Sequence, residues 1–589
     1  MGERKVERSA VQKRIKSPGG KSGADGRPFA TVSGVLTTGP DMIREVDSRI
    51  PQIGIITTKS YEVAPNRGNV EPIIVEDGIG SFGNAVGLRN PGMHRGAADL
   101  ERLRVEYEMR ALLNVSLSGK SPEEFVQLAK AFSHVADILE LNFSCPHAAA
   151  GYGMSIGTDA KTVAMYVSAV RSATDLPVFP KLTPNAENIG EIAKAAVDAG
   201  ADGITAINTL GPDRFVEPHS GRDVLINSRD NRGGRSGRPI RRIALEKIRE
   251  IRTAVGEDIP IIGMGGVENG EDVAAMREAG ADIVGIGSLW ARIHPSQWHS
   301  FFRALADDAV YRTKLATDFL LEERRMEYHP HVITASMERA GGVKLVELTG
   351  DIDFDASQFV FIWIPGVGEK PFSVAGTDPL TFIIKDRGRV SSAICSKEAG
   401  ETIYIRGAYG HAPPSCETDG AIVIAGGTGA AVAPRLVEQL SGENKAVEAY
   451  IGVSRRGAET CEREISKYAR CTVVPDDGEA AKVIRRVTEE ESGKFARRTL
   501  YVIGPADFMK RAIKAFTEFG GRPERAFASV ETPTRCGVGL CGECSCGGHL
   551  TCREGTFISA EFLENNGIDI EEVSAGKAEG VYGSPAAAL

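Results

Sequence analysis

Short apolar runs alternate with longer stretches of helical periodicity through the first half of the chain. The apolar runs predict strands at 53–57, 112–116, 138–143, 178–182, 203–208, 259–264 and 283–286. Apolar residues at helical spacing predict helices at 122–132, 160–173, 187–199 and 243–254. Because the strands are apolar throughout rather than at alternate positions, they indicate a parallel sheet that is buried on both faces. About eight such β-α units within about 280 residues predict a TIM (β/α)8 barrel.

The second half of the chain carries a different pattern. Strand-like runs alternate with turns at 344–348, 359–364, 380–384 and 402–405, which predicts a small β-barrel. An apolar strand, a glycine turn and the start of a helix follow at 421–434. Together with later apolar runs, this pattern predicts an α/β nucleotide-binding domain.

Two segments lack such periodicity. Residues 1–27 are basic and contain Gly and Ser, which predicts a disordered tail. Pro330 interrupts the charged stretch that follows the first half, which predicts a linker. The chain is therefore predicted to be an α/β protein with these segments: tail 1–27, barrel 28–310, linker 311–331, β-barrel 332–418, nucleotide-binding domain 419–530 and cysteine-rich module 531–589.

Composition narrows the classes of function. The 589 residues have a net charge of −9, which disfavours nucleic acid or an anionic membrane as the main partner. No apolar run approaches the roughly 20 residues that span a bilayer, and no signal-peptide core is visible at the N-terminus. Half of the ten cysteines fall between residues 536 and 552, unlike a disulfide framework. We therefore expect a soluble cytoplasmic protein.

The cysteine cluster reads RCGVGLCGECSCGGHLTC from Arg535 to Cys552. Its C-x4-C-x2-C spacing with a later cysteine is that of a plant-ferredoxin [2Fe–2S] site, whereas a zinc site usually shows two separated C-x2-C pairs. The predicted ligands are Cys536, Cys541, Cys544 and Cys552. Cys546 is an alternative fourth ligand, although Cys544 and Cys546 would crowd one cluster. Positive φ is expected at Gly537, Gly539 and Gly542, because the backbone must wrap the cluster.

Polar residues mark the ends of the predicted barrel strands, where such barrels carry their chemistry. They are Lys59, Asn114, Asn142, Cys145, Lys181 and Asn208, with glycines at 265, 266 and 287. Lysines stabilise negative charge on a flavin ring, asparagines bond flat polar rings, and late glycine loops bind phosphate through N–H groups. The pattern therefore favours a flavin site.

Seven motifs in this half resemble the catalytic subunit of NAD-linked dihydroorotate dehydrogenases. They are TTKS (57–60), NAVGLRNPG (84–92), ELNFSCP (140–146), PKLTPN (180–185), INTLGP (207–212), GGRSG (233–237) and GMGG (263–266). The resemblance covers about residues 28–310 and implies FMN as cofactor and (S)-dihydroorotate as substrate.

The resemblance also implies roles for individual residues. Cys145 would be the base that takes a proton from C5 of dihydroorotate while a hydride leaves C6 for N5 of FMN. The implied substrate positions are Lys59, Asn84, Gly87, Leu88, Asn142, Asn208 and Thr209. The implied FMN positions are Ser33, Gly34, Lys59, Asn114, Asn142, Lys181, Ser236, Gly237, Gly265, Gly266, Gly287 and Ser288.

One position departs from the family. His147 stands after SCP, where the family usually has a substrate-binding asparagine. SCPH resembles the uracil-reducing dihydropyrimidine dehydrogenases instead, so a uracil or thymine dehydrogenase is the alternative enzyme. A non-catalytic flavin and iron–sulfur electron carrier is the alternative outside enzymes.

Motifs in the second half resemble ferredoxin–NAD(P) reductases. EKPFSV (369–374), GRVSSA (388–393) and IRGAYG (405–410) imply FAD. The implied FAD positions are Lys370, Pro371, Phe372, Ser373, Gly388, Val390 and Ser391. AIVIAGGTGAAVAP (421–434) is a phosphate-binding turn, and the implied NAD positions are Gly426, Gly427, Thr428 and Gly429.

Residues 332–589 as a whole resemble the electron-transfer subunit of the same dehydrogenases, here fused to the catalytic subunit. The fusion implies that electrons pass from FMN through the [2Fe–2S] cluster to FAD and NAD⁺, in de novo pyrimidine synthesis. The family's barrels pair, so a homodimer through the barrel is expected. NADP⁺ or another acceptor, and the physiological direction, stay open at this point.

Overall fold

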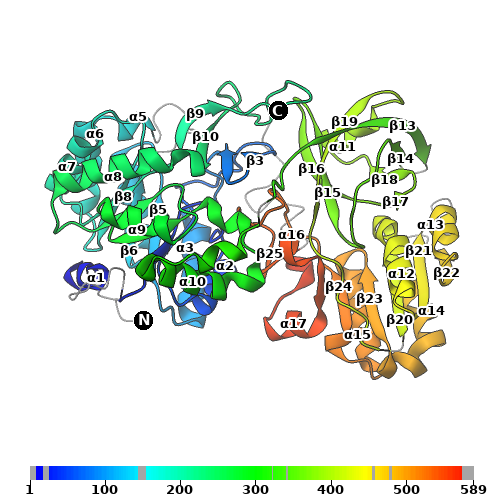
Figure 1. Ribbon diagram of the computed structural model, residues 1–589. Coiled ribbons are helices and arrows are strands. Elements are labelled where there is room, and N and C mark those ends of the chain that lie inside the picture. The colour runs from blue at the N-terminus through cyan, green and yellow to red at the C-terminus, as the bar shows by residue number, and fades with distance from the viewer. Residues whose placement is uncertain are drawn as a thin grey trace.

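A computed structural model of the chain describes residues 8–16, 25–143, 154–321, 323–339, 342–418, 420–453, 458–475 and 481–573. Figure 1 shows two lobes, with the C-terminal segment between them. Among the described residues, no helix has both the length and the apolar character that a membrane crossing requires.

The first lobe is a closed barrel of parallel strands, as the sequence predicts. Its strands follow the order β1-β12-β11-β8-β7-β6-β5-β2. They are β1 (Phe29–Thr31), β2 (Ile53–Thr57), β5 (Leu112–Leu117), β6 (Ile138–Asn142), β7 (Val178–Leu182), β8 (Ile204–Ala206), β11 (Ile261–Met264) and β12 (Ile283–Ile286). The helices around it include α2 (Pro40–Arg49), α3 (Met93–Glu106), α4 (Pro122–Phe132), α6 (Ala160–Arg171), α7 (Ile189–Asp198), α8 (Arg241–Val255), α9 (Gly270–Glu278) and α10 (Trp298–Tyr311). The strands are buried because helices cover the outside of the barrel and side chains fill its inside.

A second sheet lies over the C-terminal ends of these strands. Its order is β3-β4-β10-β9, with β3 (Ile74–Gly78), β4 (Ser81–Asn84), β10 (Arg232–Gly237) and β9 (Leu210–Arg214). β4 and β10 are antiparallel and place Phe82 opposite Ser236. The sequence does not predict this sheet, because its strands are polar or glycine-rich and show little alternation. It brings three separate segments of the chain over the mouth of the barrel.

The N-terminal segment contains a helix, α1 (Arg8–Ile15). Val11 and Ile15 are buried and join the apolar side chains inside the barrel. Arg8 donates from Nε to Asp202, 2.8 Å away, just before β8. Residues 8–15 are thus ordered, in contrast to the disordered tail expected for 1–27. The one-turn spacing of the two apolar residues lets this short helix cover the N-terminal ends of the strands.

The second lobe begins with an antiparallel sheet. It has seven strands in the order β16-β15-β19-β13-β14-β18-β17. They are β13 (His329–Arg339), β14 (Val343–Leu348), β15 (Phe359–Ile364), β16 (Gly368–Ser373), β17 (Gly376–Thr377), β18 (Leu380–Lys385) and β19 (Thr402–Tyr409). Within the described residues its outer strands β16 and β17 do not pair with each other, so the small β-barrel predicted is a half-barrel. The short helix α11 (Arg389–Cys395) packs against the apolar face of this sheet and shares one hydrophobic core with it.

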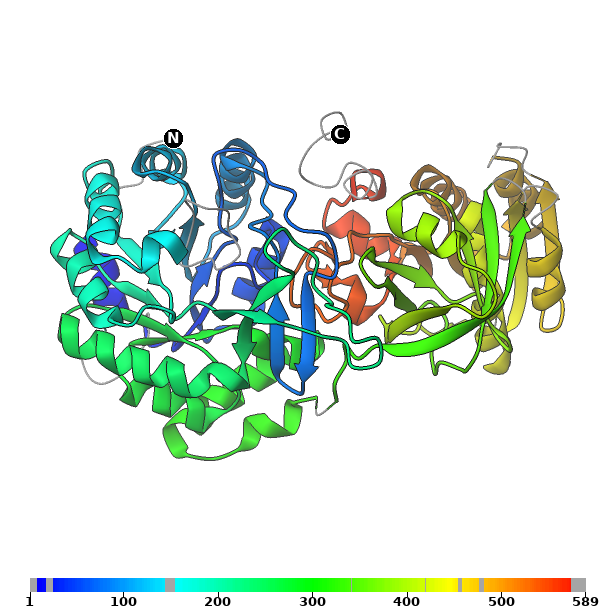
Figure 2. The ribbon, with the colours of Figure 1, turned by 90° about the horizontal axis from the view of Figure 1, so that it is seen from above.

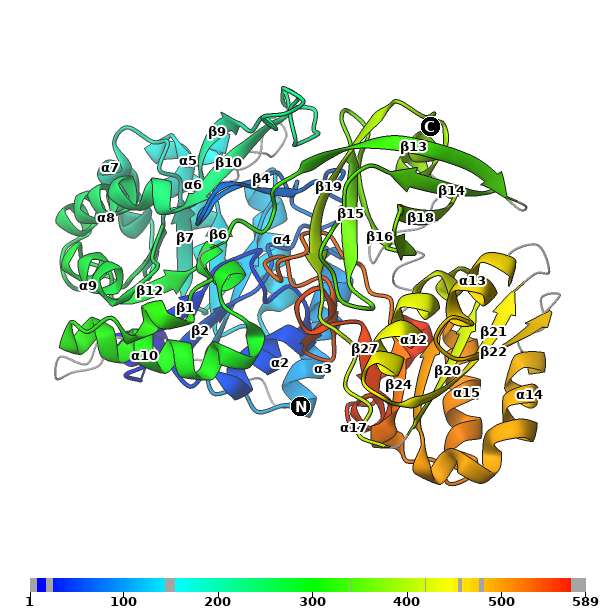
Figure 3. The same cartoon turned by 45° about the vertical axis from the view of Figure 1, so that its right-hand side comes forward.

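A mainly parallel sheet with helices beside it completes the second lobe. Its order is β22-β21-β20-β23-β24-β27. The strands are β20 (Gly420–Gly426), β21 (Ala446–Val453), β22 (Arg470–Pro475), β23 (Thr499–Ile503), β24 (Ala526–Ser529) and β27 (Phe557–Ser559), with helices α12 (Ala433–Gly442), α13 (Ala458–Ile465), α14 (Ala481–Glu491) and α15 (Ala506–Glu518) beside them (Figure 3). The strands are parallel apart from β27, which pairs antiparallel with β24. β27 falls within the predicted cysteine-rich module, so this part of the module joins the sheet.

The rest of that module lies between the lobes, as the view from above shows (Figure 2). It contains β25 (Ser545–Cys546), β26 (His549–Leu550), α16 (Thr551–Glu554) and α17 (Ala560–Asn565). Val538, Leu540 and Leu550 belong to the same apolar cluster as the barrel core. The cysteine-rich segment is therefore packed onto the barrel and also hydrogen-bonded into the other lobe.

Candidate active site

A cavity opens at the C-terminal ends of the barrel strands, with about 1270 Å³ of empty space including its mouth. Its walls include every predicted substrate position and every predicted FMN position except Asn114. The structure thus brings these residues together from distant parts of the sequence, while their binding roles stay predictions.

Hydrogen bonds orient the polar groups of the cavity. Lys181 donates from Nζ to Ser33 Oγ at 2.8 Å. Asn142 donates from Nδ2 to Ser60 Oγ at 3.0 Å, and Asn208 donates to Asn142 Oδ1 at 3.4 Å. The two amides are therefore held in fixed orientations on one wall, which suits recognition of a flat ring by its edge.

Several glycines also line the cavity. Gly34 has a φ of +77°, and a Cβ there would meet no atom within 4 Å. A Cβ at Gly237 would collide with the carbonyl oxygen of Gly80, and one at Gly266 would lie 2.7 Å from the Cβ of Arg241. Only glycine fits at Gly237 and Gly266, as in the glycine-rich loops that bind phosphate through backbone N–H groups. The donors and these glycines fit a flavin mononucleotide.

Asn114 lies deeper than the cavity lining. Its Nδ2 donates to Thr57 Oγ1 at 3.1 Å, whereas its Oδ1 is buried without a hydrogen-bond partner. A buried orphan acceptor is costly unless a ligand or water satisfies it. Asn114 is not among the residues that line the cavity, and its role toward FMN stays a prediction. The predicted base Cys145 and its neighbour His147 lie outside the described residues.

The four predicted cluster ligands converge in one buried loop, hereafter the cysteine loop (residues 535–553). Cys544 Sγ lies 3.2 Å from Cys552 Sγ. The N–H of Cys541 points to Cys536 Sγ at 3.5 Å, and the Cys536 thiol also bonds the thiol of Cys552. Cys546 packs in a different apolar cluster, with residues of the second lobe. The structure therefore groups Cys552, and not Cys546, with the other three thiols.

The hydrogen-bond donors directed at the sulfur of Cys536 fit an iron–sulfur cluster site. Burial alone raises the pKa of the Cys536 thiol, but hydrogen bonds from Cys541, Cys552 and the N–H of Val538 bring the pKa well below its usual value. Positive φ is confirmed at all three loop glycines, Gly537 (81°), Gly539 (76°) and Gly542 (69°). No three His, Cys, Asp or Glu side chains of the described residues surround a single ion position. A [2Fe–2S] cluster needs none, because four thiolates are shared between its two irons.

The cysteine loop closes one side of the barrel cavity. Leu540, next to Cys541, is part of the cavity wall. The N–H of Leu36 donates to the carbonyl of Leu540 at 2.9 Å, and Thr38 donates from Oγ1 to the carbonyl of Cys541 at 3.1 Å. A Cβ at Gly542 would collide with the carbonyl oxygen of Leu36. The loop is therefore in direct backbone contact with the barrel at residues 36–38.

Comparisons with known proteins bear on the first lobe. The family model for dihydroorotate dehydrogenase matches residues 26–307. The catalytic subunit of dihydroorotate dehydrogenase B (NAD(+)) from Methanopyrus kandleri is 40% identical over 265 residues, which are 44% of this chain and 81% of that protein. Its counterpart from Methanocaldococcus jannaschii is 42% identical over 236 residues, 40% of this chain and 74% of that one.

The chain belongs to the dihydroorotate dehydrogenase family. Residues 26–307 form its NAD(+)-type catalytic domain, and the family implies FMN. A crystal structure of a dihydroorotate dehydrogenase from Eimeria tenella, in complex with ferulenol, matches at 19% identity with a TM-score of 0.41, covering 50% of this chain and 84% of that one. That likeness is too weak to bear on the fold.

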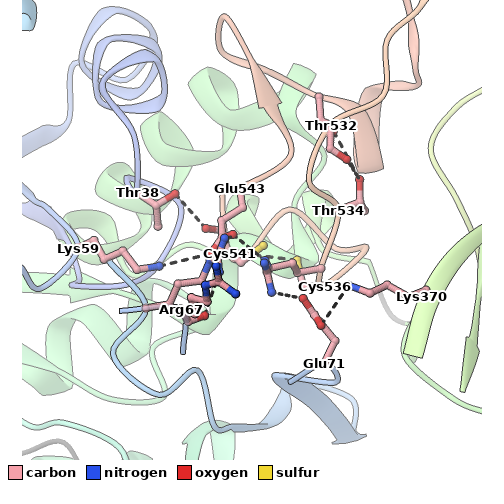
Figure 4. Close-up of polar contacts among 12 residues, drawn as sticks. Thr38, Lys59, Arg67, Glu71, Lys370, Thr532, Thr534, Cys536, Cys541 and Glu543 are labelled. Atoms are coloured by element: carbon pink, nitrogen blue, oxygen red, sulfur yellow. Dashed lines mark hydrogen bonds and ion pairs between the residues drawn. The ribbon is translucent and has the colours of Figure 1, made fainter. Parts of the chain in front are cut away.

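A chain of ion pairs leads from the dihydroorotate dehydrogenase cavity to the second lobe (Figure 4). Lys59 donates from Nζ to Glu543 Oε1 at 3.4 Å. Glu543 Oε2 accepts from Arg89 Nε at 2.9 Å and from Arg535 Nε at 2.7 Å. Arg535 also bonds Glu71, and Glu71 accepts from Lys370 Nζ at 3.2 Å. The chain joins the cavity, the cysteine loop and the first residue of the KPFS motif.

Burial and neighbouring charges set the pKa values of the residues in these ion pairs. Burial lowers the pKa of Lys59, and Glu543 opposes the change. Burial raises the pKa of Glu543, but Lys59, Arg535 and Arg89 hold it below its usual value. Sequence reasoning missed Glu543, although a carboxylate inside the C-x2-C gap is a visible signal.

A second buried ion pair supports the cysteine loop. Arg406 on β19 and Glu369 on β16 are both fully buried, and Arg406 donates through Nε and Nη2 to the two carboxylate oxygens at 2.8 Å and 2.6 Å. Arg406 Nη1 also donates to the carbonyl of Cys536 at 2.9 Å. The half-barrel thus holds the backbone of one cysteine of the loop.

The predicted FAD positions lie on two adjacent elements. Residues 370–373 end strand β16, and Gly388 precedes α11, where Ser391 Oγ accepts from the N–H of Gly388 at 3.0 Å. Arg389 donates to the carbonyl of Val367 and joins the two elements. The ammonium of Lys370 contacts Glu71 of the dihydroorotate dehydrogenase domain. The FAD roles stay predictions.

The GGTG turn follows strand β20. Gly427 has a φ of +61° and begins a short 3-10 helix (Gly427–Val432) that leads into α12. β20 lies between β21 and β23, where the strand order reverses. Ligands of open α/β sheets bind at such a switch point, so Gly426, Gly427 and Gly429 stand where a nucleotide phosphate is expected. Their role toward NAD stays a prediction.

Proposed function

We propose that this chain is a single-chain dihydroorotate dehydrogenase that oxidises (S)-dihydroorotate to orotate and reduces NAD⁺, in de novo pyrimidine synthesis. When bound, FMN supplies a hydride acceptor, a [2Fe–2S] cluster a one-electron carrier, and FAD the link to NAD⁺. The catalytic half rests on the family, and the electron-transfer half is the proposal.

One observation carries the proposal. Leu540 belongs to the cavity wall and directly precedes Cys541 of the cysteine loop. A cluster in this loop therefore lies against the cavity that fits the flavin. An electron carrier placed there has a role only if electrons leave the cavity toward the second lobe.

The residues of the cavity have separate tasks. The fixed amides of Asn142 and Asn208 offer donors and acceptors to the alternating N–H and C=O edge of a pyrimidine. Lys59 and Lys181 stabilise negative charge on the ring and on the substrate carboxylate. Cys145 takes the proton from C5, because a thiolate serves as a base near neutral pH where cations lower its pKa.

The second lobe holds the remaining groups of the proposal. Cys536, Cys541, Cys544 and Cys552 bind the cluster, the KPFS and GRVSS motifs bind FAD, and the GGTG turn binds NAD. Arg406 fixes the carbonyl of Cys536, so the half-barrel and the cluster keep a constant orientation. The chain also forms a homodimer through the barrel, which sedimentation equilibrium measures directly.

An anaerobic assay tests the proposal. The full chain is reconstituted with FMN, FAD, iron and sulfide and mixed with dihydroorotate or dihydrouracil, each with NAD⁺ or NADP⁺. We expect dihydroorotate to bleach the flavin and NAD⁺ to be reduced. Bleaching by dihydrouracil alone would favour a dihydropyrimidine dehydrogenase, and absence of bleaching by dihydroorotate would refute the proposal.

A further inference from the structure

Arg553 is a buried arginine that directly follows Cys552 on α16, and only 3% of it is exposed. Its guanidinium donates to three backbone carbonyls: those of Ala291 at 2.8 Å, Val538 at 3.0 Å and Ile293 at 3.2 Å. Ala291 and Ile293 belong to the barrel lobe, whereas Val538 belongs to the cysteine loop. One side chain therefore bridges the two.

Arg553 differs from the other buried arginines at this interface. Arg535 and Arg406 each contact carboxylates, those of Glu543 and Glu369 among them. The acceptors recorded for Arg553 within the described residues are carbonyls, and its Nε is buried with no hydrogen-bond partner. A buried cation without a counter-charge is costly, so a negative group is expected beside it.

The nearby groups that can supply this charge are chiefly cysteine thiols. The groups whose negative charge acts on Arg553 are Cys552, Cys536 and, more weakly, Glu554. An arginine guanidinium is protonated near neutral pH. Cys552 and Cys536 are two of the four grouped thiols, which become thiolates when they hold iron.

We propose that Arg553 is the counter-cation of the iron–sulfur cluster. The inference rests on the cluster of the proposed function. Addition of one electron converts one Fe(III) to Fe(II), makes and breaks no bond, takes up no proton and adds one unit of negative charge. The electron comes from flavin that dihydroorotate has reduced. A fixed cation beside the thiolates stabilises the reduced form more than the oxidised form, so Arg553 raises the reduction potential.

Three substitutions separate this role from simple bridging of the two lobes. Arg553→Met removes the charge and the donors, Arg553→Gln keeps some donors, and Arg553→Lys keeps the charge. The readout is the cluster midpoint potential of the full reconstituted chain, from a redox titration followed by electron paramagnetic resonance. We expect Met and Gln to lower the reduced-to-oxidised ratio at a fixed potential by about tenfold, which is about 59 mV for a one-electron couple. Lysine should recover most of this loss.

Arg252→Met is the matched control. Arg252 also donates to backbone carbonyls, those of Gly280 at 3.0 Å and Ile259 at 2.8 Å, but lies at the opposite end of the barrel and pairs with Asp282. Its loss should leave the cluster potential unchanged. A shift as large as that of Arg553→Met would show that the potential responds to general loosening of the fold.

Each result of these experiments either supports or overturns the inference. Unchanged potentials in loaded Met and Gln variants, or an equal shift in the Lys variant, overturn the inference. If the Arg553→Met and Arg553→Gln variants bind no iron, an Arg553→Lys variant that binds the cluster supports the inference. An Arg553→Lys variant that binds no cluster overturns it. An unsubstituted chain that binds no iron and sulfide refutes the proposed function itself, so the two failures are distinguishable.

Discussion

The ammonium of Lys59 lies 3.4 Å from the carboxylate of Glu543, although 484 positions separate the two residues in the chain. Lys59 lines the cavity of the catalytic domain, and Glu543 stands between two cysteines of the cysteine loop. Both side chains are only 6% exposed, so water screens their attraction weakly. The charge of the catalytic cavity is therefore set in part by the other half of the protein.

Substitution Glu543→Gln should make the cavity more positive by one unit. Orotate is an anion, so we expect it to bind on the order of fivefold to tenfold more tightly, the size expected of one charge near a buried site. The change of flavin absorbance on titration with orotate gives the dissociation constant. Lys59→Met should weaken the binding of orotate by a similar factor. Glu561→Gln, in the same module as Glu543, is the control. Equal dissociation constants in fully loaded Glu543→Gln and unsubstituted protein would contradict this expectation.

The ion pairs of Glu71 should be lost in acid. Burial raises the pKa of Glu71, but Arg535 and Lys370 hold it below the ordinary value of 4.5. Because the folded pKa is the lower one, this stabilisation is present above pH 4.5 and is lost as the pH falls through the folded value. The melting-temperature advantage of the unsubstituted protein over Glu71→Gln should therefore shrink as the pH falls below 4.5. An advantage that grows in acid would show that Glu71 is not ion-paired.

The two candidate fourth ligands give opposite expectations. Cys552 lies 3.2 Å from Cys544 through sulfur, whereas Cys546 packs among residues of the second lobe. Cys552→Ser should therefore lose or severely alter the cluster, and Cys546→Ser should keep normal iron, sulfide and visible absorbance. The reverse result would assign Cys546 as the ligand.

Cys145→Ser tests the predicted base. A serine hydroxyl is a far weaker base near neutral pH than a thiolate, so turnover with dihydroorotate should fall on the order of a hundredfold or more. FMN content should stay that of the unsubstituted protein, as flavin absorbance after gel filtration shows. Undiminished turnover in a variant that retains FMN would refute the role.

Local patterns were sufficient for the barrel. The strands predicted at 53–57 and 178–182 match the observed bounds, because continuous apolar runs between helices are buried on both faces. The sheet of β3, β4, β10 and β9 was missed, since glycine-rich and polar strands leave no such trace. The predicted small β-barrel is a half-barrel, because strand periodicity does not specify whether a sheet closes.

The predicted cavity residues came from motifs, and the structure places them in one cavity apart from Asn114. Glu543 and Arg553 were not predicted, because the contacts that tie them to the barrel, with Lys59 and Ala291, span hundreds of positions and follow no spacing rule. Such contacts depend on how the two halves dock. Docking is a tertiary property that a single sequence does not display.

Strand β27 has a consequence for the motion of the enzyme. It lies shortly after the cysteine loop and pairs with β24 of the second lobe, while the cysteine loop itself is packed on the barrel. If the second lobe moved relative to the barrel during catalysis, the contacts of this segment with one of the two lobes would have to break in every turnover. If electrons pass through this loop as proposed, they cross fixed distances, and we expect turnover not to slow as glycerol raises the viscosity of the solvent.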